Sequence, residues 1–190
     1  MNIKSERKRQ LILEKAEEIF IKKGFTRVTM QDIVDACSIS RGGIYLYFSS
    51  VSEIFIEVIN NHHKARKSKF NIIENMDFEL LLDKFFEEEK QELLSMKDSL
   101  KTAMYEFFLA NKQNNKVFFH DALFELKHPI EEILQIGMYN KTIMYEDIDA
   151  LAEMIMLWIE GMEALAVSTD ISIEFLERQI SFMKKIILRK

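Results

Sequence analysis

Residues 29–48, TMQDIVDACSISRGGIYLYF, constrain the fold more than any other stretch of the chain. The hydroxyl of Thr29 can cap a helix, and Asp32 follows as an acidic partner in the first turn. Ser40 can cap a second short helix that starts at Arg41. Two short helices joined by a turn of about three residues predict a helix-turn-helix.

The second of these helices contains Gly42 and Gly43, which each cost roughly 1 kcal/mol relative to alanine in a helix interior. Their missing side chains allow a backbone to approach another surface closely. Arg41, Tyr45 and Tyr47 project from the same segment and offer donors for phosphates and base edges. The simpler alternatives are a glycine pair that forms a loop and tyrosines that pack in the core.

Three motifs occur in order between residues 12 and 55: ILEKAEEIFIKKGF, then T-M-x-x-I-V, then SRGGIYLYF. With these motifs the chain resembles the TetR family of bacterial transcription regulators over roughly its first third. The resemblance implies an all-α fold with a three-helix DNA-binding domain, expected over residues 1–49. It also implies a helical domain for ligand binding and dimerisation over residues 50–190.

The sequence departs from the family pattern at three positions. Ser38 replaces the usual glycine of the turn, and it must adopt the backbone geometry that the turn requires. Gly43 replaces a small β-branched or hydroxyl residue and cannot contact bases through a side chain. Val51 replaces a frequent lysine at the start of the next helix, so a phosphate contact is absent or passes to Ser50 or Ser52.

Base readout is therefore expected to depend on Gln31 and Arg41, while hydroxyl groups of neighbouring residues position the DNA backbone. By resemblance, Ile44 and Phe48 point inward. The residues expected to bind DNA are Thr29, Gln31, Ser40, Arg41, Gly42, Gly43, Tyr45 and Tyr47.

Five glycines and one proline in 190 residues are few, so the composition favours helices joined by short loops. The single cysteine, Cys37, excludes an internal disulfide, and no Cys or His cluster has zinc spacing. Cys37 is expected to be a small buried hydrophobe, with redox sensing as the alternative. We expect no cofactor, no signal peptide and no membrane-spanning segment, and hence a cytoplasmic protein.

The net charge of −5 is distributed unevenly along the chain. Residues 1–69 contain 13 basic and 8 acidic residues, a net charge of +5, whereas residues 70–190 carry −10. A basic amino-terminal third is typical of a surface that meets a polyanion. Arg7, Lys8 and Arg9 form either a flexible basic arm or a simple solvated terminus.

Hydrophobic periodicity predicts about nine helices in total. Gly24 is expected to end the first helix in a left-handed conformation, and Pro129 is expected to kink or break a later one. Apart from the two motif helices, the expected ranges are 5–23, 51–69, 78–96, 98–110, 116–139, 147–167 and 172–188.

The segment IDALAEMIMLWIEGMEALAV is apolar on more than one stripe, which indicates burial on several sides. Gly161, Ala164 and Ala166 permit close helix contact. The resemblance implies that this helix and the last one form a four-helix interface in a homodimer. Such a dimer places two reading helices roughly 34 Å apart on a palindromic double-stranded DNA operator. A fully intramolecular core is the alternative.

The phenylalanines and methionines of the carboxyl-terminal part favour an adaptable pocket for a hydrophobic or aromatic small-molecule effector that lowers DNA affinity. The alternatives are a filled core with no effector, control by a protein partner, activation in place of repression, and an α-helical enzyme. The enzyme is the weakest of these because no catalytic arrangement stands out. The candidate effector-binding residues are Phe85, Phe86, Met104, Phe107, Phe108, Phe118, Phe119, Met154, Trp158 and Met162.

Overall fold

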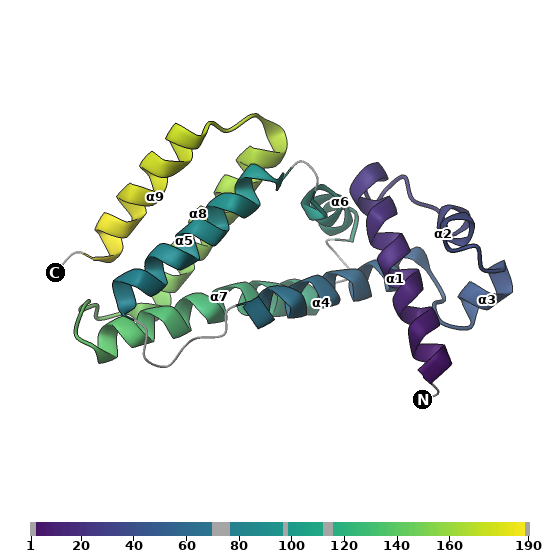
Figure 1. Cartoon of the computed structure of the whole chain (residues 1–190), viewed down its shortest axis with the longest axis horizontal. Coiled ribbons are helices and arrows are strands. Elements are labelled where there is room, and N and C mark those ends of the chain that lie inside the picture. Colours follow the sequence, from purple (N-terminus) through teal and green to yellow (C-terminus); the bar gives the residue numbers. More distant parts are fainter. Residues whose placement is uncertain (1–2, 70–76, 97–98, 112–115, 189–190) are drawn as a thin grey trace. The chain divides into compact units, whose positions relative to one another are not determined.

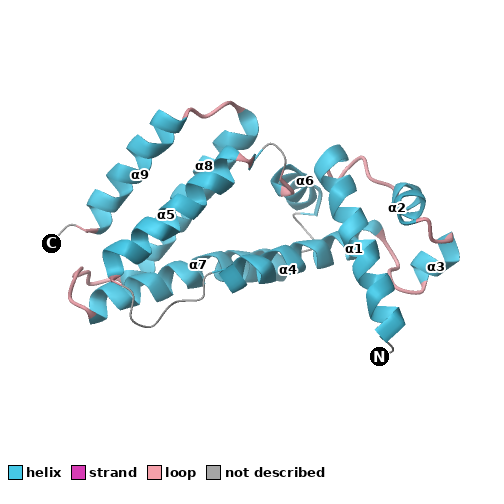
Figure 2. Ribbon diagram, viewed as in Figure 1, coloured by secondary structure: helices cyan, strands magenta, loops and turns pink. Residues whose placement is uncertain are grey.

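Figure 1 and Figure 2 show the computed structural model, which describes residues 3–69, 77–96, 99–111 and 116–188. The side chains of residues 3, 63–69 and 116–126 lie outside this description. Every regular element in the described ranges is a helix, which confirms the all-α class. The nine described helices are α1 (Ile3–Lys23), α2 (Met30–Cys37), α3 (Arg41–Tyr45), α4 (Val51–Lys69), α5 (Phe78–Leu94), α6 (Lys101–Asn111), α7 (Lys116–Tyr139), α8 (Ile148–Ser168) and α9 (Ile173–Ile187).

The chain divides into two compact units. Residues 1–69 and 98–115 form the N-terminal unit, and residues 70–97 and 116–190 form the C-terminal unit. The functional boundary expected between residues 49 and 50 stays a prediction. Among the helices of the described ranges, none is long and apolar enough to span a lipid bilayer.

The N-terminal unit is built around an aromatic cluster that α1, α4 and α6 share. The Phe20 ring lies 4.6 Å from that of Phe55, centroid to centroid, and Phe107 of α6 lies 5.1 Å from Phe55. Phe25, just after α1, contacts Phe107 at 4.9 Å. Helix α6 therefore completes the core under the predicted helix-turn-helix, although it is distant in sequence.

The C-terminal unit packs α5, α7, α8 and α9 around one main apolar cluster. In Figure 1, α5 and α8 run side by side, in agreement with the contacts between them. The side chains of Asp147 and Ser172 accept hydrogen bonds from Ala150 N and Phe175 N, so these residues are the N-caps of α8 and α9.

Of the two outcomes expected at Pro129, the break is wrong and the kink stays a prediction. Helix α7 runs continuously with Pro129 in its interior. Proline removes only one backbone donor, and the residues that follow it hold the helix against the core. Ile130, Ile133 and Leu134 are at most 5% exposed, so their burial offsets the lost hydrogen bond.

Candidate nucleic-acid interface

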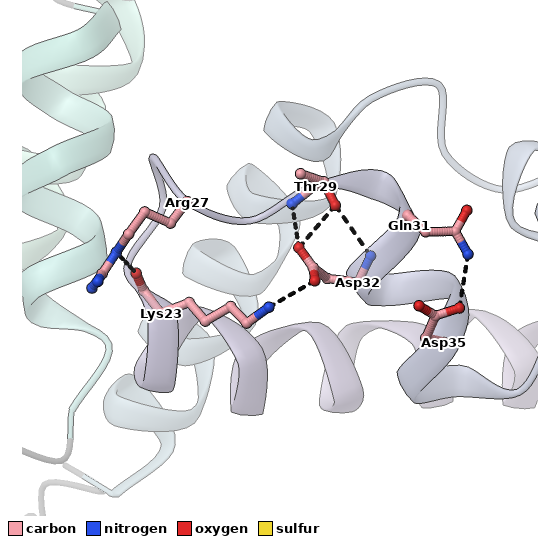
Figure 3. Close-up of polar contacts among 6 residues, drawn as sticks. All are labelled: Lys23, Arg27, Thr29, Gln31, Asp32 and Asp35. Carbon is pink, nitrogen blue, oxygen red and sulfur yellow. Dashed lines mark hydrogen bonds and ion pairs between the residues drawn. The ribbon is translucent and has the colours of Figure 1, made fainter.

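Helix α2 begins at a reciprocal cap between Thr29 and Asp32 (Figure 3). The Asp32 amide donates to the Thr29 hydroxyl at 3.2 Å, and the Thr29 amide and hydroxyl both donate to Asp32 Oδ2 at 2.8 Å. Lys23 Nζ donates to Asp32 Oδ1 at 2.7 Å. The hydrogen bond from Lys23, followed by those from Thr29, lowers the pKa of Asp32 from 3.8 to about 2. The ionised carboxylate thus joins the end of α1 to the start of α2.

The turn between α2 and α3 adopts the geometry that the sequence requires. Ser38 has φ 53° and ψ 33°, in the left-handed region where a glycine is usual. Ser40 Oγ accepts a hydrogen bond from Gly43 N at 3.2 Å and caps α3. The structure therefore confirms two capped helices joined by a left-handed turn, which is the predicted helix-turn-helix.

The two glycines of α3 have different surroundings. A Cβ atom on Gly42 would have no neighbour within 4 Å. A Cβ atom on Gly43 would lie 2.7 Å from Ile39 Cγ2 and 3.1 Å from Ser40 Oγ. Contacts with Ile39 and Ser40 explain why residue 43 of α3 is a glycine. At Gly42, by contrast, the absent side chain leaves open space beside the helix.

Arg41 and Tyr45 form an exposed pair on the outer side of α3. The Arg41 guanidinium lies 5.8 Å from the centroid of the Tyr45 ring, and Tyr45 is 45% exposed. Tyr47 is half-buried, while Ile44 and Phe48 are fully buried, as the resemblance implied. The stacked tyrosine restricts the arginine side chain while leaving its donors available on the outer side.

Gln31 and Thr29 are also exposed, but both already make internal hydrogen bonds. Gln31 Nε2 donates to Asp35 Oδ1 at 2.7 Å, one helical turn further along α2 (Figure 3). The Thr29 hydroxyl is part of the cap. A base contact by Gln31 therefore requires its amide to leave Asp35 or to use its carbonyl oxygen.

The basic residues near the amino terminus belong to helix α1 rather than to a flexible arm. Arg9 pairs with Glu57 of α4, and its guanidinium lies 5.0 Å from the centroid of the Phe48 ring. Arg7 and Lys8 are exposed on the helix. Arg9 therefore packs within the fold, which leaves Arg7 and Lys8 to contribute positive charge at the surface.

Sequence reasoning missed the structural role of Glu106. Glu106 Oε2 accepts hydrogen bonds from Thr26 N and Thr26 Oγ1, each at 2.9 Å. A Cβ atom on Gly24 would lie 2.8 Å from Glu106 Cδ, and Gly24 itself has φ 74°. Helix α6 thus holds the turn between α1 and α2 through one carboxylate.

Three of the effector candidates, all on α6, lie in the N-terminal unit. Met104 and Phe107 are buried there, and the Phe107 ring packs on the aromatic cluster that supports the helix-turn-helix. The ring of Phe108 lies 6.0 Å from that of Phe107 and is half-buried. Phe107 thus joins α6 to the aromatic cluster of the N-terminal unit by direct packing.

The other candidates with described side chains belong to the C-terminal unit. Phe85 and Phe86 lie in its main cluster, and the Phe86 ring contacts Trp158 at 5.9 Å. Met162 belongs to a smaller cluster with α9, and Met154 is 38% exposed. The side chains of the remaining two candidates fall outside the described residues; they are Phe118 and Phe119.

A groove of about 540 Å³ lies between α5 and α9 in the C-terminal unit. Its lining combines apolar side chains such as Phe86, Ile180 and Leu188 with charged ones such as Lys90 and Glu177. Among the candidates with described side chains, Phe86 is the one that lines this groove. This lining carries more charge than the apolar pocket expected from the sequence.

The outward side of α8 exposes apolar and small side chains at helical spacing. Leu157 is 64% exposed, and a Cβ atom on Gly161 would meet nothing within 4 Å. Met154 and Leu165 continue the same stripe at 38% and 39% exposure, and Phe182 of α9 is 63% exposed. An apolar stripe of this kind on a helix is typical of a surface that another helix covers.

The geometry defines a helical protein whose N-terminal unit contains a capped helix-turn-helix. The sequence profile described as bacterial regulatory proteins of the tetR family matches residues 12–58. The chain is 31% identical over 106 residues to YfiR, an uncharacterized HTH-type transcriptional regulator of Bacillus subtilis (strain 168). This match covers 55% of the chain and 52% of YfiR, about half the length of that relative.

Two solved structures share the fold across nearly the whole chain. A TetR transcription regulator from Haloarcula marismortui ATCC 43049 superimposes with a TM-score of 0.81 at 15% identity, covering 96% of this chain and 97% of that one. A transcriptional regulator from Aquifex aeolicus VF5 gives a TM-score of 0.68 at 23% identity, covering 95% and 99%. Residues 12–58 are therefore similar to the tetR family of bacterial regulatory proteins, and the chain shares its fold with these two solved regulators. Its relatives are named as regulators and not as enzymes.

Proposed function

We propose that this regulator binds a palindromic operator as a homodimer through α2 and α3 and represses transcription until an effector releases it. The observation that carries the proposal is the outer side of α3. There, an arginine restricted by Tyr45 lies beside the open space in front of Gly42. A guanidinium group with several N–H donors, next to a backbone without a side chain at Gly42, suits close approach to a DNA groove. Such a protein acts in the cytoplasm, where its operator is.

The DNA contacts divide into two kinds. Arg41 and Gln31 read base edges, since guanidinium and amide groups match the donors and acceptors of guanine and adenine. The hydroxyl groups of Ser40, Tyr45 and Tyr47, and that of Thr29 once it leaves Asp32, contact phosphates, with close backbone approach at Gly42. Residues 1–49 are the DNA-binding domain in this proposal, and residues 50–190 regulate and dimerise.

Dimerisation is supported by the exposed stripe on α8. Two copies of Leu157 facing each other beside Gly161 would bury apolar surface with close backbone contact. Phe182 supplies a large exposed ring on α9, the other helix expected at the interface. A two-fold axis through these helices would present two reading helices to consecutive turns of DNA.

Release by an effector is supported by the position of α6. This helix carries Met104, Phe107 and Phe108, and it also holds the α1–α2 turn through Glu106. A hydrophobic molecule that binds better to a shifted α6 would therefore disturb the reading head. For the candidates outside α6, contact with an effector stays a prediction; they are Phe85, Phe86, Met154, Trp158 and Met162, with Phe118 and Phe119 outside the described side chains.

The test is binding to DNA from upstream of the protein's own gene, measured by fluorescence anisotropy at increasing salt. Specific binding with a log–log slope near −0.9 for each neutralised phosphate is expected. Arg41→Ala is expected to relax base preference, whereas Tyr45→Ala weakens binding to all sequences equally. Weak binding that is the same for operator and random DNA would overturn the proposal.

Effector control needs a separate measurement. Apolar and aromatic compounds that raise the melting temperature are expected to lower operator affinity. If every stabilising compound leaves operator affinity unchanged, the effector part of the proposal fails and DNA binding still stands.

A further inference from the structure

Leu46, the residue directly after α3, is 83% exposed. Its neighbours in the same segment are arranged differently, because Ile44 and Phe48 are fully buried in the N-terminal unit. Sequence reasoning gave roles to Tyr45 and Tyr47 and none to the leucine between them. A large apolar side chain therefore projects from the end of the reading helix into solvent.

The position of Leu46 on the helix places it beside the open space at Gly42. The two residues are four positions apart, so they lie on the same helix face, one turn from each other. A Cβ atom on Gly42 would have no neighbour within 4 Å. A surface that approaches α3 over Gly42 therefore meets Leu46 as the next side chain on that face.

The exposed side of α3 thus consists of two parallel rows. Arg41 and Tyr45 form a polar row, held together by the stacking of the guanidinium on the ring at 5.8 Å. Gly42 and Leu46 form an apolar row beside it. The polar row can donate hydrogen bonds to base edges, while the apolar row can only offer van der Waals contact.

We propose that Leu46 contacts the C5-methyl group of a thymine in the major groove and so sets a base preference of this regulator. The inference rests on the proposed DNA-binding function. Thymine is the base that presents an apolar group in that groove, and apolar side chains recognise it there. With a rise of about 1.5 Å per residue, Leu46 lies roughly 7.5 Å along the axis from Arg41. Both residues therefore fit within a groove about 12 Å wide.

The leucine cannot substitute for the polar contacts around it. Its side chain has no donor for phosphate oxygens and no acceptor for base amino groups. Contact with a methyl group removes apolar surface of both partners from water, which favours thymine over cytosine at the same position. Leu46 therefore adds specificity of a kind that Arg41 and Gln31 do not supply.

The experiment first selects binding sites from random duplex DNA with the full-length protein. Each thymine of the selected half-site is then replaced by uracil, which removes only the C5-methyl group, and affinities are measured by anisotropy. At one position the replacement is expected to weaken wild-type binding roughly fourfold per half-site, the effect of one buried methyl group. Leu46→Ala is expected to bind the thymine and uracil forms equally at that position.

Two matched variants make the result specific. Leu46→Met keeps an apolar side chain of similar volume and is expected to retain the preference for thymine. Leu109→Ala removes a leucine that is 79% exposed on α6, and it is expected to behave like the wild type. Because Leu46 is so exposed, its substitution is expected to leave the melting temperature unchanged.

The outcomes separate this inference from the proposed function. If the wild type selects a sequence and Leu46→Ala discriminates thymine from uracil as well as the wild type does, the role of Leu46 is overturned and DNA binding stands. If the wild type selects no sequence at all, the proposed function and the role of Leu46 both fall.

Discussion

At the scale of single residues, Asp32 is the charged side chain that joins α1 to the helix-turn-helix. Its carboxylate accepts from Lys23 Nζ, Thr29 N and Thr29 Oγ1. These contacts lower its pKa to about 2 in the folded protein, below the ordinary value of 3.8. A carboxyl group with a depressed pKa stabilises the fold above its unfolded pKa, and this stability is lost as the pH falls.

We therefore predict that the free energy of unfolding falls as the pH drops from about 5 to 2, and that Asp32→Asn reduces this fall. Urea unfolding at several pH values measures the effect, with Asp35→Asn as a control on the same helix. An equal pH dependence in Asp32→Asn and the wild type would show that the carboxylate contributes no linked stability.

The two glycines of α3 give a second prediction at this scale. Gly43→Ala is expected to lower the melting temperature, because its Cβ atom would lie 2.7 Å from Ile39 Cγ2. Gly42→Ala meets no neighbour and removes a residue that disfavours helix, so it is expected to stabilise the protein by up to about 1 kcal/mol. It is also expected to weaken operator binding by obstructing close approach.

Thermal unfolding and anisotropy together check this pair of variants. Equal effects of both substitutions on stability would contradict the different surroundings of Gly42 and Gly43. Unchanged operator affinity in Gly42→Ala would contradict close approach at α3.

At the scale of elements, α6 is joined to the α1–α2 turn by one side chain. Glu106→Ala removes both acceptor contacts to Thr26, which are partly exposed, and is expected to cost about 1 kcal/mol. Hydrogen exchange at the Thr26 amide is expected to accelerate, while the amides of α2 keep their protection. Glu106→Gln is the matched control, because its amide oxygen can still accept a hydrogen bond from Thr26. If the Thr26 amide exchanges as slowly in Glu106→Ala as in the wild type, the contact does not hold the turn.

Element boundaries were largely predictable because their signals are local. Thr29, Ser40, Asp147 and Ser172 each cap a helix through an amide three residues away, so a short window contains the whole interaction. The observed helix starts agree with the expected ones to within three residues. The continuity of α7 was not predictable, because the core contacts that offset Pro129 come from other helices.

The site was predictable only where it depends on local geometry. The left-handed Ser38 and the inward Ile44 follow from the motif itself. The bond between Glu106 and Thr26 joins residues 80 positions apart, and no short-range pattern reports it. The exposure of Leu46 likewise depends on how the turn after α3 leaves the core, which periodicity over so short a helix does not determine.

At the scale of the whole molecule, the exposed apolar stripe of α8 and the exposed ring of Phe182 are the basis for expecting a homodimer. Phe182→Glu places a charge at the proposed dimer interface and is expected to give monomers in sedimentation velocity with an unchanged helical CD spectrum. Operator affinity is expected to drop steeply, because a monomer contacts only one half-site. Met144→Glu, at a residue 78% exposed outside α8 and α9, is the control. A Phe182→Glu protein that sediments like the wild type would remove this surface from the interface.

Because α6 packs into the N-terminal unit, the helix-turn-helix cannot simply be moved to another protein together with α1 and α4 alone. Residues 1–69 grafted onto the regulatory body of another protein would leave behind Phe107 and Glu106. The rings of Phe25 and Phe55 would then lose an aromatic neighbour, and Thr26 would lose its acceptor. A chimeric regulator with the DNA preference of this chain therefore has to inherit residues 98–115 as well, as a second, separate insert.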